Sequence, residues 1–229
     1  MNTALPKVLV GLNGKPLIQH LIDSLRDLVL GYKPIVVVGH KYDLVQSFLG
    51  TNFIYAFQEG QFGTAHAVSA AKTKVQAENV IVLYGDMPFI KSESLIQLMD
   101  IHTQNNSMFS MFTATVPNFN NQYESHLGFG RIIRDTNGKI KKIQEFVDAS
   151  PDEREITEVN PGIYMFNTNW LWQNLDTVQK NPHGEYYLTD LVELAISNNV
   201  SIATASIDPL EVFGINTPEQ LKQAVEILK

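Results

Sequence analysis

The chain has no cysteine among its 229 residues, which excludes disulfides and thiolate metal sites. It has no apolar run near the ~20 residues of a membrane-spanning helix and no signal-peptide pattern at its start. Basic residues are few: 17 Lys and Arg stand against 24 Asp and Glu, a formal net charge of −7, and they are scattered. We therefore expect neither a membrane nor a nucleic acid as partner. A cytoplasmic location agrees with the cysteine-free composition.

The rest of the composition is that of an ordinary globular chain, with 44% hydrophobic and 18% charged residues. The sequence contains no repeat, no low-complexity tract and no flexible linker. A chain of this length can bury a sizeable core without disulfides or metal. We expect residues 1–229 to form a single domain.

Short β-branched runs alternate with stretches of helical period. The expected strands are 35–38, 53–55, 80–83, 109–115, 163–166 and 200–205; the expected helices are 17–28, 43–49, 64–74, 92–103, 168–175, 188–197 and 218–228. Such alternation is typical of a parallel sheet covered on both faces. Residues 130–134 and 139–145 predict a hairpin about Asn137-Gly138. The expected fold class is α/β: a Rossmann-like, mostly parallel open sheet with helices on both faces and a small antiparallel insertion.

Two helix starts carry capping signals. Thr217 with Pro218 predicts the N-terminus of the last helix, and Thr64 is a plausible N-cap as well. The chain's opening is different, because Met1–Leu9 begins with polar residues and has Pro6 in its middle. It is a poor central strand.

Oxygen-bearing residues follow two apolar stretches. Asp86 comes just after the expected strand 80–83, where ligands collect at the carboxyl ends of parallel strands. Asn216 follows residues 212–215. A carboxylate and an amide carbonyl suit a hard cation such as Mg2+. Each residue alone could also be an ordinary turn residue, and for Asn216 this is the more common role.

The segment Gln58–Ala67 is a Gly-bearing loop that opens a helix. Its backbone N–H groups could meet a ligand edge, and Gln58 could pair with a base amide. His66 on that helix is more simply interpreted as a packed or solvent-facing histidine than as a ligand. The six histidines of the chain are scattered, so the sequence predicts no zinc site.

Several other polar positions are compatible with ligand contact or with ordinary turns and caps. They are Lys7, Gly128 to Arg131, Glu145, Asn160, and the segment Gly184 to Asp190. Neither a Ser/His/Asp order nor a paired-carboxylate motif indicates hydrolysis, and the GxGxxG and Walker patterns are absent.

Together these segments resemble the sugar-1-phosphate nucleotidyltransferases, above all the uridylyltransferase (pyrophosphorylase) domain of the bifunctional N-acetylglucosamine-1-phosphate uridylyltransferases. The matching pieces occur in family order across nearly the whole chain. They are Leu5-Pro6-Lys7-Val8-Leu9, Gly14-Lys15-Pro16-Leu17, Gln58 through Ala67, Tyr84-Gly85-Asp86-Met87-Pro88, Gly128-Phe129-Gly130-Arg131-Ile132, Glu145, Asn160-Pro161-Gly162-Ile163, Gly184-Glu185-Tyr186-Tyr187-Leu188-Thr189-Asp190 and Gly214-Ile215-Asn216.

The resemblance implies the nucleotide-diphospho-sugar transferase fold and an enzyme that forms a nucleotide sugar and pyrophosphate from a sugar 1-phosphate and UTP. UDP-N-acetylglucosamine or a related UDP-sugar is the implied product, and another pyrimidine nucleotide stays open. The implied roles are Mg2+ binding for Asp86 and Asn216; nucleotide binding for Gln58, Gly63 and Thr64; sugar-phosphate binding for Tyr84, Gly130, Glu145, Asn160 and Thr189; and a catalytic part for Lys7 and Asp86. The reaction needs positioning and charge neutralisation more than a covalent group.

The sequence departs from the family pattern in three ways. The family begins with an apolar strand and a Gly-rich phosphate loop, and here Met1 falls at the end of that loop. Val147 stands where the family often has a lysine, which bears on the identity of the sugar. The hexapeptide repeats of an acetyltransferase half are absent, and the oligomeric state is not predicted. These departures leave an alternative function: a truncated, weak or inactive homologue that binds nucleotide or sugar phosphate without turnover.

Overall fold

The structure, a computed structural model, describes residues 5–228. Its strands are β1 (Gly11–Leu12), β2 (Lys15–Pro16), β3 (Ile35–Val38), β4 (Ile54–Phe57), β5 (Asn79–Val82), β6 (Phe109–Thr115), β7 (Gly130–Arg134), β8 (Ile140–Gln144), β9 (Glu158–Asn160), β10 (Tyr164–Asn167) and β11 (Ile202–Ser206). Its α-helices are α1 (Leu17–Ser24), α2 (Tyr42–Leu49), α3 (Thr64–Ala70), α4 (Ser92–Gln104), α5 (Pro151–Arg154), α6 (Thr168–Leu175), α7 (Asp190–Ser197) and α8 (Pro218–Ile227). Short 3-10 helices are η1 (Lys7–Leu9), η2 (Gly50–Asn52), η3 (Asn121–Gly128), η4 (Phe146–Asp148) and η5 (Pro209–Val212).

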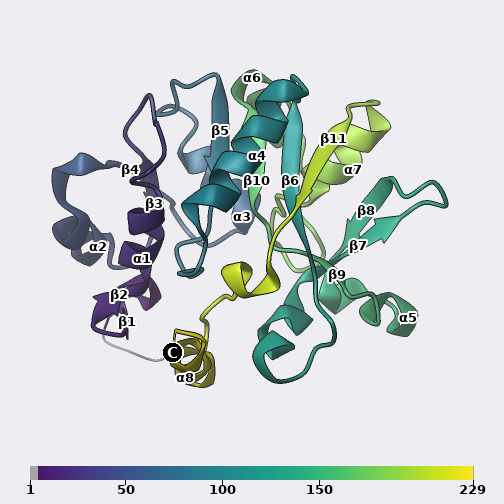
Figure 1. Ribbon diagram of the computed structural model, residues 1–229. Coiled ribbons are helices and arrows are strands. Elements are labelled where there is room, and N and C mark those ends of the chain that lie inside the picture. Colours follow the sequence, from purple (N-terminus) through teal and green to yellow (C-terminus); the bar gives the residue numbers. More distant parts are fainter. Residues whose placement is uncertain (1–4, 229) are drawn as a thin grey trace.

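A seven-stranded sheet forms the centre of the molecule, in the order β5-β10-β6-β9-β7-β8 with β11 beside β6 (Figure 1). Strand β10 is antiparallel to both β5 and β6, and β11 is parallel to β6. Strands β5, β6 and β11 therefore point the same way, and β10 alone reverses among these four. Strands β3 and β4 pair in parallel as a separate two-stranded sheet. The expected α/β class is confirmed, and the central sheet is mixed rather than mostly parallel, because β10 and the strands β7 to β9 pair antiparallel.

The expected hairpin is also present. Strands β7 and β8 pair antiparallel, and the carboxylate of Asp135 accepts hydrogen bonds from the backbone N–H groups of Asn137 and Lys139 to close the turn. The short strand β9, which the sequence did not reveal, pairs antiparallel with both β7 and β6. It joins the hairpin to the main sheet, so the antiparallel insertion continues the sheet.

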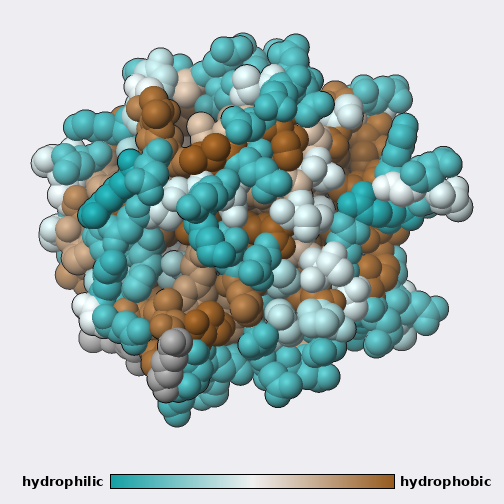
Figure 2. All heavy atoms as spheres, in the orientation of Figure 1, coloured by the Kyte–Doolittle hydropathy of each residue, from teal (hydrophilic) through white to brown (hydrophobic). Residues whose placement is uncertain are grey.

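The sheet is packed on both faces because alternate residues of its strands point to opposite sides. On β6, Phe109 and Met111 belong to a core cluster with α6 and α7, whereas Phe112 and Ala114 belong to one with α4. Figure 1 shows α4 crossing in front of these strands. Hydrophilic residues cover most of the outer surface of the face in Figure 2, and hydrophobic ones show in patches between them. Within residues 5–228, no helix has both the length and the apolar character to cross a membrane.

One cap was predicted correctly and the other was not. The Thr217 hydroxyl accepts from the Gln220 N–H, and the Gln220 side chain accepts from the Thr217 N–H, which forms a capping box. Thr64, by contrast, is the first residue of α3 rather than its N-cap. The N-cap is Gly63, and the Thr64 hydroxyl accepts instead from the backbone N–H of Leu188, so it ties α3 to the segment before α7.

The start of the described chain is not a strand. Lys7–Leu9 forms the single 3-10 turn η1, which agrees with the prediction that this segment makes a poor central strand. Residues 1–4, on which part of that prediction rests, lie outside the described residues.

Candidate functional site

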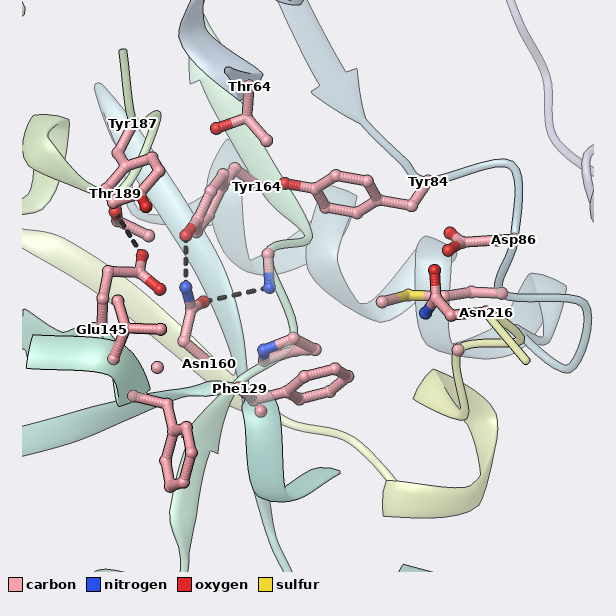
Figure 3. Close-up of a pocket in the computed structure, with 18 residues that line it drawn as sticks. Thr64, Tyr84, Asp86, Phe129, Glu145, Asn160, Tyr164, Tyr187, Thr189 and Asn216 are labelled. Carbon is pink, nitrogen blue, oxygen red and sulfur yellow. Dashed lines mark hydrogen bonds between the residues drawn. The ribbon is translucent and has the colours of Figure 1, made fainter. Parts of the chain in front are cut away.

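A cavity of about 380 Å³ opens beside the carboxyl end of β5, the start of β7 and the end of β9 (Figure 3). Most of the predicted site residues line it, although they come from distant parts of the chain: Thr64, Tyr84, Asp86, Gly130, Glu145, Asn160, Thr189 and Asn216. In Figure 3, Glu145, Asn160 and Thr189 lie at one end, Asp86 and Asn216 at the other, and Tyr84 in between. The cavity thus has two chemically different ends.

At the end lined by Asp86 and Asn216, two side-chain oxygens surround the ammonium group of Lys7. The ammonium Nζ of Lys7 lies 2.6 Å from Oδ2 of Asp86 and 2.7 Å from Oδ1 of Asn216. The loops that carry the two oxygens are joined, because the Ile215 N–H donates to the Asp86 carbonyl at 3.0 Å. The Gln220 side chain accepts from the Asn216 N–H at 2.6 Å, which fixes the approach to α8.

These two oxygens fit a metal cation by their chemistry. They already converge on one ammonium group, which stands in for a cation, and carboxylate and amide oxygens are the ligands that Mg2+ prefers. Among residues 5–228, no three His, Asp or Glu side chains gather into a metal-ligand group. A cation held by Asp86 and Asn216 would therefore take further ligands from water and substrate phosphates, which is the usual arrangement for Mg2+.

The opposite end offers fixed hydrogen-bonding groups. The Thr189 hydroxyl donates to Oε1 of Glu145 at 2.7 Å. Burial raises the pKa of the Glu145 carboxyl, a nearby Asp148 adds to this, and the Thr189 hydrogen bond opposes it. Gly130 lies beside this carboxylate, since a Cβ built there would lie 3.6 Å from Oε2 of Glu145. The same Cβ would collide with Cγ2 of Ile143 at 2.7 Å. A larger residue would therefore crowd the wall of the cavity.

Asn160 is held by two hydrogen bonds. Its amide nitrogen donates to the hydroxyl of Tyr164 at 2.6 Å, and its carbonyl oxygen accepts from the Gly162 N–H at 3.1 Å. Gly162 has a positive φ of 78°, and a Cβ there would collide with the ring of Tyr84 at 2.6 Å. Burial raises the pKa of Tyr84 to about 12, and Glu145 and Asp86 contribute to the shift. Tyr84 is thus a neutral hydrogen-bond donor at physiological pH.

Gln58 and Gly63 are not among the cavity-lining residues but lie on the adjoining loop before α3. The Gln58 amide nitrogen donates to the Gly63 carbonyl at 3.3 Å and to Nδ1 of His66 at 2.9 Å. An amide nitrogen can only donate, so Nδ1 of His66 accepts in this contact, and the ring packs edge-on against Phe62. His66, interpreted from sequence as a packed histidine, in fact orients the Gln58 amide.

Sequence reasoning assigned no role to Phe146 or Tyr164, and noted Val147 only as a departure from the family pattern. Phe146 and Val147 line the cavity beside Glu145, and Val147 is 61% exposed. No Lys, Arg or His is among the 18 described lining residues. Tyr164 was hidden in an apolar run that reads as a core strand. These contacts had no sequence signal, because they depend on which side of a strand or turn faces the cavity.

Arg131, which the sequence placed among the positions for ligand contact or an ordinary turn, lies behind the wall of the cavity instead of lining it. It is fully buried, its guanidinium lies 4.4 Å from the ring centroid of Phe119 and 5.1 Å from that of Phe146, and it donates to the carbonyls of Phe129 and Arg154. Burial lowers its pKa. Because Phe129 and Phe146 both line the cavity, Arg131 holds two parts of the wall in place.

Comparison with known proteins gives the class. The solved structure of apo UDP-glucose pyrophosphorylase superposes with a TM-score of 0.77 at 15% identity, covering 98% of this chain and 90% of that one. That of a CMP:2-keto-3-deoxy-manno-octonic acid synthetase complexed with CTP gives a TM-score of 0.69 at 18% identity, covering 98% and 92%. At these identities the likeness shows a shared fold. The fold is therefore the α/β fold that these two proteins share.

The family follows from the sequence match. The model of the MobA-like NTP transferase domain matches residues 1–150, so the chain belongs to that family. It is also 36% identical over 232 residues to the bifunctional protein GlmU of Clostridium novyi (strain NT) and 36% identical over 233 residues to that of Bacillus subtilis (strain 168). Each alignment covers 100% of this chain and 49% of the relative, so the chain spans about half the length of these curated relatives. The resemblance inferred from the motifs is confirmed.

Proposed function

We propose that this chain is a sugar-1-phosphate uridylyltransferase. A phosphate oxygen of the sugar 1-phosphate attacks the α-phosphorus of UTP, the bond from that phosphorus to the bridging oxygen breaks, and pyrophosphate leaves. The single observation that carries the proposal is the two-ended cavity: Asp86 and Asn216, both bonded to Lys7, line one end, and Glu145, Asn160 and Thr189 line the other. Residues 1–229 would act as one nucleotidyltransferase domain in the cytoplasm.

The base preference is argued from the orientation of the Gln58 amide. Its nitrogen is engaged with the Gly63 carbonyl and with His66, which leaves the carbonyl oxygen Oε1 as the group to meet a ligand. Uracil presents an N–H donor at its N3 position, whereas cytosine presents an acceptor there. An acceptor at Oε1 therefore favours UTP over CTP.

The sugar end accommodates a ligand rich in hydroxyl groups. The Glu145 carboxylate accepts from Thr189 through one oxygen and has further lone pairs for a sugar hydroxyl. The Asn160 amide is kept in one orientation by Tyr164 and Gly162, so it adds a fixed polar edge. N-acetylglucosamine 1-phosphate is the proposed sugar, because the motifs of this chain resemble those of the N-acetylglucosamine-1-phosphate uridylyltransferases.

The end lined by Asp86 and Asn216 would mainly neutralise the negative charge of the phosphates. Asp86 and Asn216 would hold Mg2+, which when bound offsets the charge of the phosphates and orients them. Lys7, whose ammonium lies between those two residues, adds a positive charge for the triphosphate. In-line transfer needs such positioning rather than a covalent nucleophile.

The test is pyrophosphate release from UTP and N-acetylglucosamine 1-phosphate in the presence of Mg2+. We expect release that requires both substrates, with CTP and dTTP and other sugar 1-phosphates as the comparison panel. No turnover with any member of the panel would refute the enzyme function. UTP binding by calorimetry without pyrophosphate release would support the alternative of a binding homologue.

The variant Asp86→Ala tests the metal site in the same assay, and Asp23→Ala is its matched control. Asp86→Ala should abolish the Mg2+-dependent turnover while circular dichroism and the unfolding midpoint stay close to those of the native chain, because Asp86 lies at the cavity and not in a core cluster. Asp23→Ala, which removes a surface carboxylate paired with Lys15, should keep full turnover. Retained turnover in Asp86→Ala would remove Asp86 from the metal site.

A further inference from the structure

Lys7 occupies the space between two residues that the proposed function gives to a metal. Its ammonium is 2.6 Å from Asp86 and 2.7 Å from Asn216, although these residues lie 79 and 209 positions away in the chain. Figure 3 shows the Asp86 and Asn216 side chains facing one another at one end of the cavity. The Lys7 ammonium therefore fills the space between the Asp86 and Asn216 oxygens.

An ammonium group and a divalent cation cannot both take this position. Mg2+ approaches its oxygen ligands to about 2.0–2.1 Å, closer than the ammonium does, and the two like charges would repel at such a separation. A cation bound to Asp86 and Asn216 therefore requires the Lys7 ammonium to move.

The surroundings make Lys7 the part that moves. Its side chain is 37% exposed and sits on a flexible stem, whereas the Asp86 side chain is 16% exposed. The two oxygen-bearing loops are joined by the Ile215–Asp86 backbone hydrogen bond, and Asn216 is held by Gln220. The oxygens can stay in place while the ammonium leaves.

We propose that Lys7 and the divalent cation are alternative occupants of one site, and that their exchange couples metal binding to nucleotide binding. Without metal, Lys7 keeps Asp86 and Asn216 together and neutralises the carboxylate. When the cation enters, Lys7 loses its counter-ion and becomes available to the triphosphate, whose negative charge supplies a new partner. Cation and nucleotide should therefore strengthen each other's binding, by the same factor in both directions. This inference rests on the proposed function for the presence of a metal and a triphosphate.

The test measures metal binding without any substrate. Free Mn2+ is followed by electron paramagnetic resonance while it is titrated into the native chain and into Lys7→Met, which keeps an unbranched side chain of similar size and removes its charge. We expect Lys7→Met to bind Mn2+ about tenfold more tightly, within the usual range of coupling between sites. The combined variant Lys7→Met with Asp86→Asn should lose this gain. Equal or weaker Mn2+ binding by Lys7→Met would overturn the proposal.

Lys15→Met is the matched control, because Lys15 also pairs with a carboxylate, at 2.5 Å from Asp23, on the surface of the same N-terminal part. It should bind Mn2+ as the native chain does. A gain in Lys15→Met equal to that in Lys7→Met would mean that any lost positive charge raises the affinity, and would count against exchange at one site.

A second measurement uses the native chain and does not depend on how a variant folds. Acetylation of lysines is followed residue by residue with mass spectrometry, with and without Mg2+. The cation should speed the labelling of Lys7 as its ammonium leaves Asp86, and should leave Lys15 unchanged. Slower or unchanged labelling of Lys7 would contradict the exchange. A chain that exchanges Lys7 for metal yet releases no pyrophosphate would keep this inference and lose the proposed function.

Discussion

His126 donates a hydrogen bond from Nε2 to the carbonyl oxygen of Pro209 at 2.7 Å, across 83 positions of the chain. The ring is fully buried, and it contacts the rings of Phe129 and Phe213 at centroid distances of 5.2 and 6.5 Å. Phe129 lines the cavity, and Phe213 precedes the loop that carries Asn216. His126 therefore ties together two walls of the site without reaching a ligand itself.

Replacing His126 by phenylalanine should keep the ring contacts but leave the Pro209 carbonyl without its donor. We expect a loss of about 1–3 kcal/mol in the free energy of unfolding and a rise in KM for the sugar 1-phosphate. His126→Gln, which retains a donor, should lose less. Urea unfolding and steady-state kinetics give the comparison, with the exposed His40→Phe as control. A His126→Phe chain as stable as His126→Gln would show that the hydrogen bond contributes nothing.

The same histidine predicts how stability depends on pH. Burial lowers the pKa of His126 below its unfolded value of about 6.5. As pH falls, His126 therefore takes up a proton in the unfolded chain before it does so in the folded protein. The stability that the neutral, buried His126 contributes is complete above about pH 6.5 and is lost as pH falls towards the folded pKa. His126→Gln should therefore lose less stability than the native chain between pH 7 and 5. Burial also lowers the pKa of His102, so part of the slope should remain. Thermal unfolding across this range is the measurement.

Glu145→Gln should separate activity from stability. Because burial raises the pKa of Glu145, the ionised carboxylate costs stability at neutral pH, and this cost disappears below the unfolded value of about 4.3. The variant should therefore melt higher than the native chain at pH 7–8 and gain nothing near pH 4. Its kcat/KM should fall about tenfold to a hundredfold, since it loses a charge-assisted hydrogen bond to the sugar. Exposed Glu93→Gln should change neither quantity. A loss of stability at pH 8 would contradict the sign.

Gly63→Ala should disturb the loop before α3, which carries Gln58 and is proposed to bind the nucleotide base. Gly63 has a φ of 98°, and a Cβ there would lie 2.4 Å from the carbonyl oxygen of Tyr186. We expect destabilisation by more than about 1 kcal/mol and a higher KM for the nucleotide. Gly138→Ala is the matched control, since Gly138 also has a positive φ, 79°, but no atom within 4 Å of a Cβ. The difference between the two unfolding free energies isolates the clash, and equal values would mean that only backbone strain matters.

His66→Phe should weaken the discrimination between UTP and CTP. Without the Nδ1 acceptor, the Gln58 amide can turn and present its N–H groups to the base, which suits the N3 acceptor of cytosine. The ratio of kcat/KM for the two nucleotides should move towards one, and KM for the sugar phosphate should stay constant. His183→Phe, at an exposed position, should leave the ratio unchanged. An unaltered ratio in His66→Phe would separate His66 from base recognition.

Much of the fold follows from local patterns. Helix α6 and strands β3 and β6 have the predicted bounds, because their periodicity and their flanking residues act over a few positions. The expected helix 17–28 ends at Ser24, where the chain goes into turns, and short strand β9 carried too few residues for a pattern. The mistaken cap at Thr64 has a tertiary reason: its hydroxyl is engaged by Leu188, 124 positions away.

The sequence by itself determined the fold class, the family and several of the polar residues that line the cavity, because motifs and periodicity are local properties. Only the tertiary structure decided their relations: the ammonium of Lys7 between Asp86 and Asn216, the Gln58 amide oriented by His66, and the buried Arg131 behind the cavity wall. The physical reason is that hydrogen bonds and ion pairs act over about 3 Å in space, whatever the distance along the chain.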